Sequence, residues 1–221
     1  MTELQRKTSY GLLLAAMCLG GHLVTLHTVA RADETGDDGF VPMFNGKNLS
    51  GWQTTGNWLY ERDGVVALKP NSRRRRLRPD YKSFLWTNAT YDDFILDLEF
   101  KVGTGGSSGV FLRSTSPRRY IQAQIRDSHG KGPLGDRTAG AVVGVAKPSR
   151  NMAKPAGQWN RMIITCNENR MQVELNGEEV IDIDLSKSPE TRSLRSGRIG
   201  LENANNPVAF RNVRIKELTR E

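Results

Sequence analysis

The sequence predicts an all-β protein built as an antiparallel sandwich or jelly roll. Ten or more short apolar segments follow one another at regular spacing, and most of them alternate apolar with polar residues. No segment keeps a helical period over three turns, and no repeat of fixed length points to a propeller. Together these observations favour two packed antiparallel sheets.

The first 32 residues have the layout of a signal peptide. A short basic start precedes an apolar run, and Ala30-Arg31-Ala32 forms a small-residue cleavage site, so we expect cleavage before Asp33. The alternative is an uncleaved membrane anchor, for which the run is only marginally long enough. Residues 33–39 then form a polar linker and residues 40–219 form one domain. We expect a secreted or periplasmic protein with no membrane span after signal cleavage.

The charge of the chain is positive and partly concentrated in one place. Removal of residues 1–32 leaves 29 Lys and Arg against 23 Asp and Glu, a net charge of +6. Much of the excess lies in the stretch from Arg73 to Arg78, which contains five arginines. This cluster predicts either a solvated loop between strands or a patch for a polyanion, as in a surface adhesion protein. Because no aromatic residue is interleaved with the arginines, we expect no nucleic-acid partner.

The expected strands can be placed one by one along the chain. Residues 58–68 form a hairpin around an Asp63-Gly64 turn, and residues 170–185 form another around Asn176-Gly177. A further turn is expected at residues 167–170. The other expected strands are 84–88, 94–102, 108–114, 120–127, 139–146, 161–168, 197–203 and 208–218.

Three of these strands carry polar side chains on one face. Successive strand residues point to opposite faces, so Glu99 lies opposite the apolar face of 94–102, and Gln122 and Gln124 lie opposite the apolar face of 120–127. Arg113 shares its side with Phe111. If the three strands are neighbours, Glu99, Arg113, Gln122 and Gln124 form one polar floor suited to sugar hydroxyls. A solvated outer face is the alternative.

Several common catalytic constellations are missing. His129 is the only histidine after residue 32, which rules out a three-histidine zinc site. Cys166 is the only cysteine there, so no intrachain disulfide is expected and Cys166 is predicted to be a small buried residue. No Walker loop and no dinucleotide fingerprint are present.

Carboxylates are the remaining candidate catalytic groups. Asp127, Asp136 and Glu202 lie at strand ends or in loops, and Glu99 lies within a strand. Paired carboxylates can hydrolyse glycosides. Asp127 with Asp136 could hold a divalent cation such as calcium, although no dense pattern of acidic residues supports one, so no cofactor is certain. Asp127 could equally be a turn residue, and His129 a solvated loop residue.

The order of several motifs resembles the 3-keto-disaccharide hydrolase family. The motifs are MFNGKNLSGW, YDDFILDLEFKV, SGVFLRS, QAQIRD, AGAVVGV, KPAGQWNRMIITCNENRMQVELNGEEV and GRIGLENANNPVAFRNVRIKEL, and they extend over about residues 40–218. The resemblance implies a concanavalin A-like jelly-roll sandwich and export in bacteria that degrade glycans. It further implies hydrolase or lyase activity on glucosides oxidised at C3.

The chain departs from the family pattern at a few positions. Gln122 stands where family members commonly have glutamate, and an amide cannot act as a general base. Glu202 stands where glutamine is frequent, Val143 where tyrosine is common, and Ser107 where asparagine is usual.

We therefore predict an exported hydrolase or lyase of 3-keto-glucosides with a carbohydrate substrate. The predicted catalytic residues are Asp127 or Glu99 as base and His129 as proton donor, and the predicted substrate-binding residues are Arg113, Gln122 and Gln124. No metal ligand is predicted. The alternative function, suggested by Gln122, is a carbohydrate-binding module without chemistry. The natural glycan and the oligomeric state do not follow from the sequence.

Overall fold

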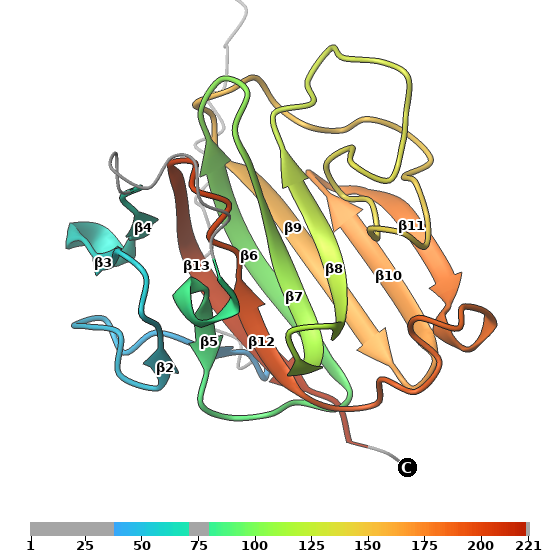
Figure 1. Cartoon of the computed structure of the whole chain (residues 1–221), viewed down its shortest axis with the longest axis horizontal. Coiled ribbons are helices and arrows are strands. Elements are labelled where there is room, and N and C mark those ends of the chain that lie inside the picture. Colours follow the sequence, from blue (N-terminus) through green and yellow to red (C-terminus); the bar gives the residue numbers. More distant parts are fainter. Residues whose placement is uncertain (1–37, 71–79, 220–221) are drawn as a thin grey trace, which may run out of the picture. The chain divides into compact units, whose positions relative to one another are not determined.

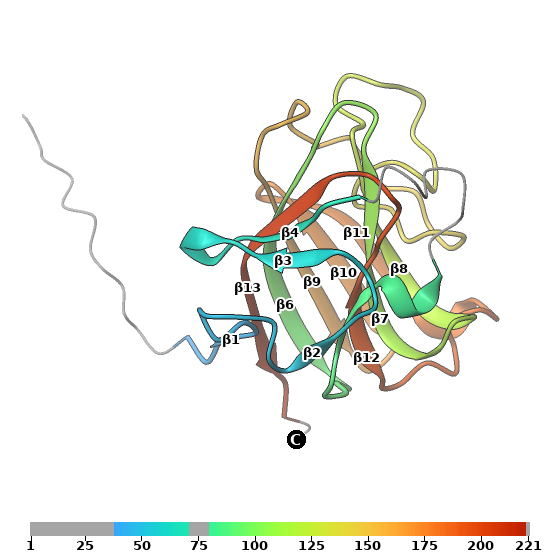
Figure 2. The ribbon, with the colours of Figure 1, turned by 60° about the vertical axis from the view of Figure 1, so that its left-hand side comes forward.

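The computed structural model describes residues 38–70 and 80–219, which form a sandwich of two antiparallel sheets (Figures 1 and 2). The eight-stranded sheet has the order β11-β10-β9-β6-β13-β4-β3, with β1 paired to β13, and the five-stranded sheet has the order β2-β5-β12-β7-β8. The predicted all-β, antiparallel jelly-roll fold is confirmed. The predicted signal peptide and the Arg73–Arg78 cluster lie outside the described residues.

Most strands lie close to the segments expected from the sequence. The eight-stranded sheet contains β1 (Val41–Pro42), β3 (Trp58–Tyr60), β4 (Val66–Leu68), β6 (Phe94–Val102), β9 (Asn160–Asn167), β10 (Arg170–Leu175), β11 (Glu178–Asp184) and β13 (Val208–Glu217). The five-stranded sheet contains β2 (Trp52–Gln53), β5 (Leu85–Thr87), β7 (Ser107–Ser116), β8 (Arg119–Arg126) and β12 (Arg198–Leu201). Short 3-10 turns are η1 (Arg62–Gly64), η3 (Tyr81–Ser83) and η4 (Leu185–Lys187).

The main core lies between the inner faces of the two sheets. It contains Phe94, Leu96, Leu98 and Phe100 of β6 together with Val110, Leu112, Ile121, Ala123 and Ile125 of β7 and β8. All nine side chains are at most 1% exposed. Each large aliphatic or aromatic residue buried in this way contributes about 1.5–3 kcal/mol. The alternation seen in the sequence therefore describes real inner and outer faces.

The predicted turns are confirmed, but one predicted strand is wrong. Asn176 and Gly177 both have positive φ, 56° and 89°, as a tight hairpin between β10 and β11 requires. Residues 139–146, in contrast, form turns, and they meet β8 at an isolated bridge between Ala123 and Val142 and through backbone hydrogen bonds on either side of it. Gly140 and Gly144 adopt φ values of 84° and 73°, which interrupt the extended chain there.

The loop between β8 and β9, residues 127–159, is the long irregular stretch drawn in yellow tones in Figure 1. Its segment at Gly140 and Ala141 forms backbone hydrogen bonds with Gln124 of β8, at 2.9 and 2.8 Å. The loop therefore lies along the edge of β8, where it continues the five-stranded sheet beyond its last strand.

A buried ion pair joins the two sheets at one end of β7. The Arg113 guanidinium lies 2.8 Å from Asp93 Oδ1, and Arg113 has no exposed surface. Its Nε donates to the Asp92 carbonyl, and its Nη1 donates to the carbonyls of Glu168 and Leu194. The pair thus connects β7 to the start of β6, to the β9–β10 turn and to the segment before β12.

This burial corrects the predicted role of Arg113 as a substrate-binding residue. Its donors are used by the protein, and φ of 46° at Arg113 coincides with a register shift in the β7–β8 pairing. The irregular backbone turns the side chain into the interior. Arg113 therefore stabilises the fold and does not face a sugar.

We expect Asp93→Asn to lower the free energy of unfolding by about 3–5 kcal/mol, because it leaves the buried Arg113 charge without its counter-charge. Urea denaturation at pH 7 measures the loss. Asp182→Asn is the matched control, since it breaks the exposed pair between Arg170 and Asp182 and should cost far less. Equal losses in the two variants would show that the buried pair does not hold the sheets together.

Candidate active site

A row of residues crosses the outer face of the five-stranded sheet. Phe111 of β7 lies opposite Gln122 of β8, and Gly200 of β12 lies opposite both Phe111 and Trp86 of β5. Because Ile121 points into the core, Gln122 points away from it. Gln122 is therefore the polar side chain at the end of a row that contains the aromatic residues Trp86 and Phe111.

Two glycines allow the large side chains of this face to lie close to the sheet. A Cβ atom at Gly200 would lie 2.3 Å from the Trp86 ring, and one at Gly109 would lie 2.5 Å from Gln122 Nε2. Both distances are far shorter than a normal van der Waals contact. The glycines thus fix where Trp86 and Gln122 can be.

Glu202, directly after β12, meets Gln122 on this face. Its Oε2 accepts a hydrogen bond from Gln122 Nε2 at 3.1 Å. The Glu202 main chain is held by Gly109, whose carbonyl accepts from the Glu202 N–H, and by Ser108, whose hydroxyl donates to the Glu202 carbonyl. A carboxylate and an amide from different strands therefore form one pair with a fixed geometry.

Burial raises the pKa of Glu202 to about 7, while the positive charge of Arg137 acts in the opposite direction. Glu202 remains partly exposed to solvent. A carboxyl group with a pKa near neutrality is half ionised at the pH where many enzymes work, which is the favourable condition for proton abstraction. Glu202 is thus the described carboxylate best suited to general-base chemistry.

An aromatic cluster lies beside this pair on the same face. It contains Trp86, Phe111, Phe84, Tyr81 and Tyr120, with ring centroids 4.2 Å apart for Tyr81 and Trp86 and 4.3 Å apart for Phe111 and Tyr120. The two tyrosines are only partly buried, whereas the other three rings are buried. The rings form a hydrophobic wall next to Gln122.

Glu99, predicted to share a polar floor with Gln122, lies on the other sheet, and that prediction is wrong. Glu99 belongs to β6, and its Oε2 accepts from Arg211 Nη2 at 2.7 Å while Oε1 accepts from Asn212. It lines a hollow of about 510 Å³ on the outer face of the eight-stranded sheet. The whole thickness of the sandwich separates the two outer faces.

Asp127 lies at the end of β8, where it holds two loops together. Its Oδ2 accepts from the Gly105 N–H at 2.8 Å and from Lys131 Nζ at 2.7 Å. The hydrogen bond from Lys131, followed by that from Gly105, lowers the pKa of Asp127. His129 is exposed, and its Nδ1 lies 2.7 Å from the Ala153 carbonyl, so Nδ1 carries the proton. Neither residue is hydrogen-bonded to Gln122 or Glu202.

Gln124 shares the outer face with Gln122 but is almost completely buried, with 1% exposure. Its Nε2 donates to Ser107 Oγ and to two backbone carbonyls. Its Oε1 is buried without a hydrogen-bond partner in the described part of the chain. The amide therefore retains one free acceptor on the face that carries Glu202.

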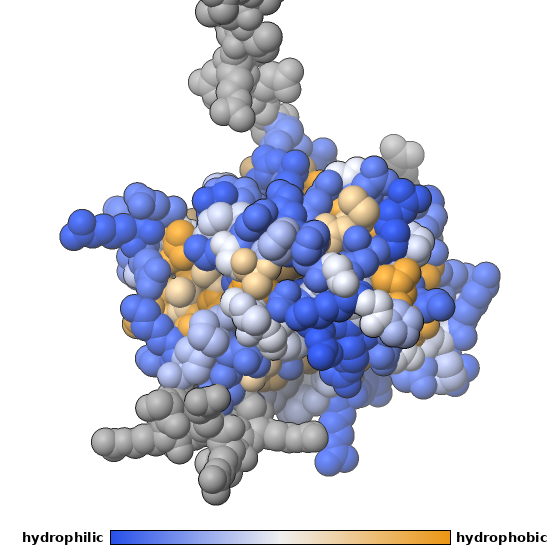
Figure 3. Space-filling view, turned by 90° about the horizontal axis from the view of Figure 1, so that it is seen from above, coloured by the Kyte–Doolittle hydropathy of each residue, from blue (hydrophilic) through white to orange (hydrophobic). Residues whose placement is uncertain are grey.

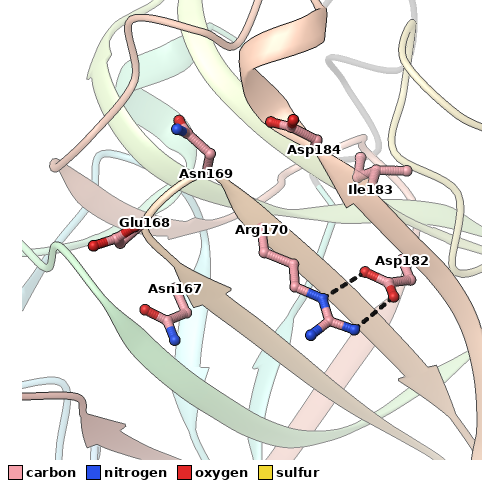
Figure 4. A pocket seen from close by; sticks show the side chains of 7 residues that line it. All are labelled: Asn167, Glu168, Asn169, Arg170, Asp182, Ile183 and Asp184. Carbon is pink, nitrogen blue, oxygen red and sulfur yellow. Dashed lines mark hydrogen bonds and ion pairs between the residues drawn. The ribbon is translucent and has the colours of Figure 1, made fainter.

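A larger hollow, of about 650 Å³, lies on the β10–β11 hairpin and contains none of the predicted site residues (Figure 4). Arg170 and Asp182, drawn there as sticks, bind each other through two hydrogen bonds of 2.8 and 2.7 Å. Within residues 38–70 and 80–219, no three His, Cys, Asp or Glu side chains gather as a metal site would require. The same residues include no helix with the length and apolar character needed to cross a bilayer.

Sequence reasoning did not place Glu202 in the site. The available signal was a double departure from the family pattern, glutamate where glutamine is frequent at 202 and glutamine where glutamate is common at 122. Only the structure shows that the two positions touch.

Comparisons with known proteins agree on one family. The model of the 3-keto-alpha-glucoside-1,2-lyase-like domain matches residues 39–216. A 3-keto-disaccharide hydrolase from Bacteroides thetaiotaomicron is 25% identical over 231 residues, which cover 82% of this chain and 79% of that protein. A protein from Parabacteroides distasonis ATCC 8503, provisionally named a glycosyl hydrolase, has a TM-score of 0.69 and 28% identity over 81% of this chain and 99% of its own. The carbohydrate-binding module CBM66 from Bacillus subtilis shares the fold, with a TM-score of 0.51 and 16% identity over 76% of this chain and 96% of its own.

The raised pKa of Glu202 makes stability depend on pH between its ordinary value of 4.5 and about 7. In this window the native state binds more protons than the unfolded chain, so the free energy of unfolding falls as the pH rises, by roughly 3 kcal/mol in total. Glu202→Gln should remove this fall and unfold at a higher urea concentration than the wild type at pH 8. Urea titrations at several pH values measure the effect.

Asp127→Asn is the control for this measurement. Because the pKa of Asp127 is lowered from 3.8, its contribution to the free energy of unfolding is present above that pH and is lost only below it. The Asp127→Asn variant should therefore show the wild-type change of unfolding free energy with pH between pH 5 and 7. If the free energy of unfolding changed with pH in the same way in wild type and in Glu202→Gln between pH 4.5 and about 7, the raised pKa of Glu202 would be contradicted.

Proposed function

Since the chain belongs to the family of 3-keto-alpha-glucoside-1,2-lyase-like domains, we propose that it is an enzyme that cleaves glucosides oxidised at C3. The relatives named as a 3-keto-disaccharide hydrolase and as a glycosyl hydrolase support a reaction on glycosidic bonds at the level of the family. The observation that carries the proposal for this chain is the hydrogen bond between Gln122 and Glu202.

The pair has exchanged its two functional groups relative to the family pattern. Family members commonly have the carboxylate at position 122 and the amide at 202, whereas this chain has the amide at 122 and the carboxylate at 202. In this chain the Gln122 amide and the Glu202 carboxylate are 3.1 Å apart, which supports the proposal that Glu202 supplies the carboxylate that is missing from β8.

The chemistry requires one well-placed base. A ketone at C3 acidifies the hydrogen on C2, and the Glu202 carboxylate takes that proton to leave an enolate. The electron pair of the enolate then expels the aglycone from C1, and the departing oxygen receives the proton that Glu202 has taken, which restores the carboxylate. Water adds to the resulting enone, so the net reaction is hydrolysis. In the proposed complex, the second N–H of the Gln122 amide donates to an oxygen of the sugar.

The other carboxylates considered from the sequence suit this role less well. Glu99 is on the opposite outer face and is bound by Arg211 and Asn212. Asp127 is bound by Lys131 and Gly105, and its lowered pKa makes it a weaker base than Glu202. Burial has the opposite effect on Glu202, whose pKa is about 7.

A carbohydrate-binding module without chemistry is the second candidate, because Gln122 cannot act as a base. In that case Glu202 would only accept a hydrogen bond from Gln122 or from a sugar hydroxyl. Wild-type protein would then be stabilised by 3-keto-glucosides in a thermal melt and would release no aglycone.

We expect Glu202→Gln to lower kcat by about 10²- to 10⁴-fold, because the base is lost while the shape of the site is kept. The double variant Gln122→Glu with Glu202→Gln returns the carboxylate to the β8 position and should recover much of this loss. Release of nitrophenol from a nitrophenyl 3-keto-glucoside measures turnover. Wild-type kcat should rise with pH through about 7, as Glu202 loses its proton.

Asp127→Asn serves as the matched control, since it also replaces a carboxylate by an amide. It should change kcat much less than Glu202→Gln. Wild-type turnover in Glu202→Gln, or loss of turnover in Asp127→Asn alone, would place the base elsewhere. If the double variant Gln122→Glu with Glu202→Gln were as inactive as Glu202→Gln, the proposed exchange of carboxylate and amide between positions 122 and 202 would be contradicted.

Export completes the proposal and rests on the sequence of the first 32 residues. Expressed with its full sequence in a bacterium, the protein should appear outside the cytoplasm with a new N-terminus at Asp33. Intact-mass measurement of the periplasmic or secreted protein checks this. A full-length chain found only in the membrane fraction would indicate an uncleaved anchor.

A further inference from the structure

A third hollow lies at the end of β8, in the first part of the β8–β9 loop. Its volume is about 220 Å³, and it takes no part in the proton transfer described above. The charged residues that line it are Arg126, Asp127, Lys131, Asp136 and Arg137. Viewed from above, the molecule presents a mainly hydrophilic surface with small, separate hydrophobic patches (Figure 3).

The charge of this hollow is positive where a ligand could reach it. Lys131 and Asp127 neutralise each other across 2.7 Å, and the Asp127 side chain is only 6% exposed. Arg126 and Arg137 are both exposed, and neither side chain has a hydrogen bond or ion pair with any residue in the described ranges. Two guanidinium groups, each able to bind an anion through paired N–H donors, therefore outnumber Asp136, the remaining carboxylate among the residues that line the hollow.

The hollow is also placed in a defined relation to the proposed base. Arg126 lies four residues after Gln122 on the same strand, so the two side chains share a face and start about 13 Å apart. Arg137 is close enough to Glu202 for its charge to act on that carboxyl group. A molecule that contacts both the Gln122–Glu202 pair and Arg126 therefore extends along β8.

We propose that this hollow is an anion subsite and that the substrate carries a carboxylate or sulfate group on its leaving-group side. The binding of the anion follows from Arg126 and Arg137 alone, whereas its assignment to the substrate rests on the proposed function. A glycoside whose second sugar is a uronic acid or a sulfated sugar fits this description. The guanidinium groups hold the acidic substituent, and the C2 hydrogen of the oxidised sugar then faces Glu202.

Binding is tested first, without turnover. Isothermal titration of the wild-type protein with glucuronate, inorganic sulfate and glucose should show binding of the two anions and none of the neutral sugar. The double variant Arg126→Gln with Arg137→Gln should weaken anion binding about tenfold or more. Arg118→Gln is the control, because it removes the same charge from an exposed arginine at the other end of β8. Equal affinity in wild type and double variant, or binding of sulfate without glucuronate, would overturn the proposal.

Turnover then separates this inference from the proposed function. A 3-keto-glucoside with a glucuronate leaving group should be preferred, in kcat/KM, to one with a glucose leaving group, and the double variant should lose this preference while Arg118→Gln keeps it. Turnover of both substrates without preference would overturn the subsite and leave the proposed function standing. Glucuronate binding that depends on Arg126 and Arg137, with no turnover of either substrate, would support the anion site and contradict the proposed function.

Discussion

The buried ion pair between Arg113 and Asp93 is the interaction on which the rest of the sandwich depends. The guanidinium belongs to the five-stranded sheet, and all its partners lie outside that sheet's own strands, at distances of 2.8 to 3.3 Å. Asp93 Oδ1 also accepts the N–H of Glu168, so the same carboxylate fixes the β9–β10 turn. Because a charge buried without its partner is costly, the ion pair favours the relative position of the two sheets in which both groups meet. The strands next to Gln122 are set within the five-stranded sheet, by the pairing of β8 with β7 and of β7 with β12.

Much of the fold could be predicted from local patterns, whereas the site could not. Alternation along residues 94–102 and 120–127 identifies the buried faces, and Asp63-Gly64 and Asn176-Gly177 identify hairpins, because these signals depend on neighbours in the chain. A sandwich, however, has two outer faces, and a period of two residues does not distinguish them. Glu99 and Gln122 therefore look equivalent in the sequence although they lie on different sheets. The partners of Arg113 are 20 to 81 residues away in the sequence, so its burial could not be predicted from local patterns either.

The pairing of Gln122 with Glu202 explains why the two groups can be exchanged between positions. An amide and a carboxylate form a donor and an acceptor, so the pair keeps its hydrogen bond whichever strand supplies the acid. Two carboxylates at this distance would repel each other, and two amides would leave the pair without an ionisable group. The surroundings restrict the exchange further, because Gly109 leaves space for the Gln122 amide and holds the Glu202 main chain. Substitutions at 122 and 202 are therefore physically coupled.

The position of Glu202 directly after β12 gives it different surroundings in two directions. Toward the end of β8 lies the hollow that is lined by Arg126 and Arg137, and the charge of Arg137 acts on Glu202. On the opposite side, Trp86 and Phe111 close the space with buried rings. Burial raises the pKa of Glu202 to about 7 and so destabilises its charged form, a cost that the packing of the aromatic cluster and of the main core must offset. The raised pKa of Glu202 and the close packing around it are thus two results of the same burial.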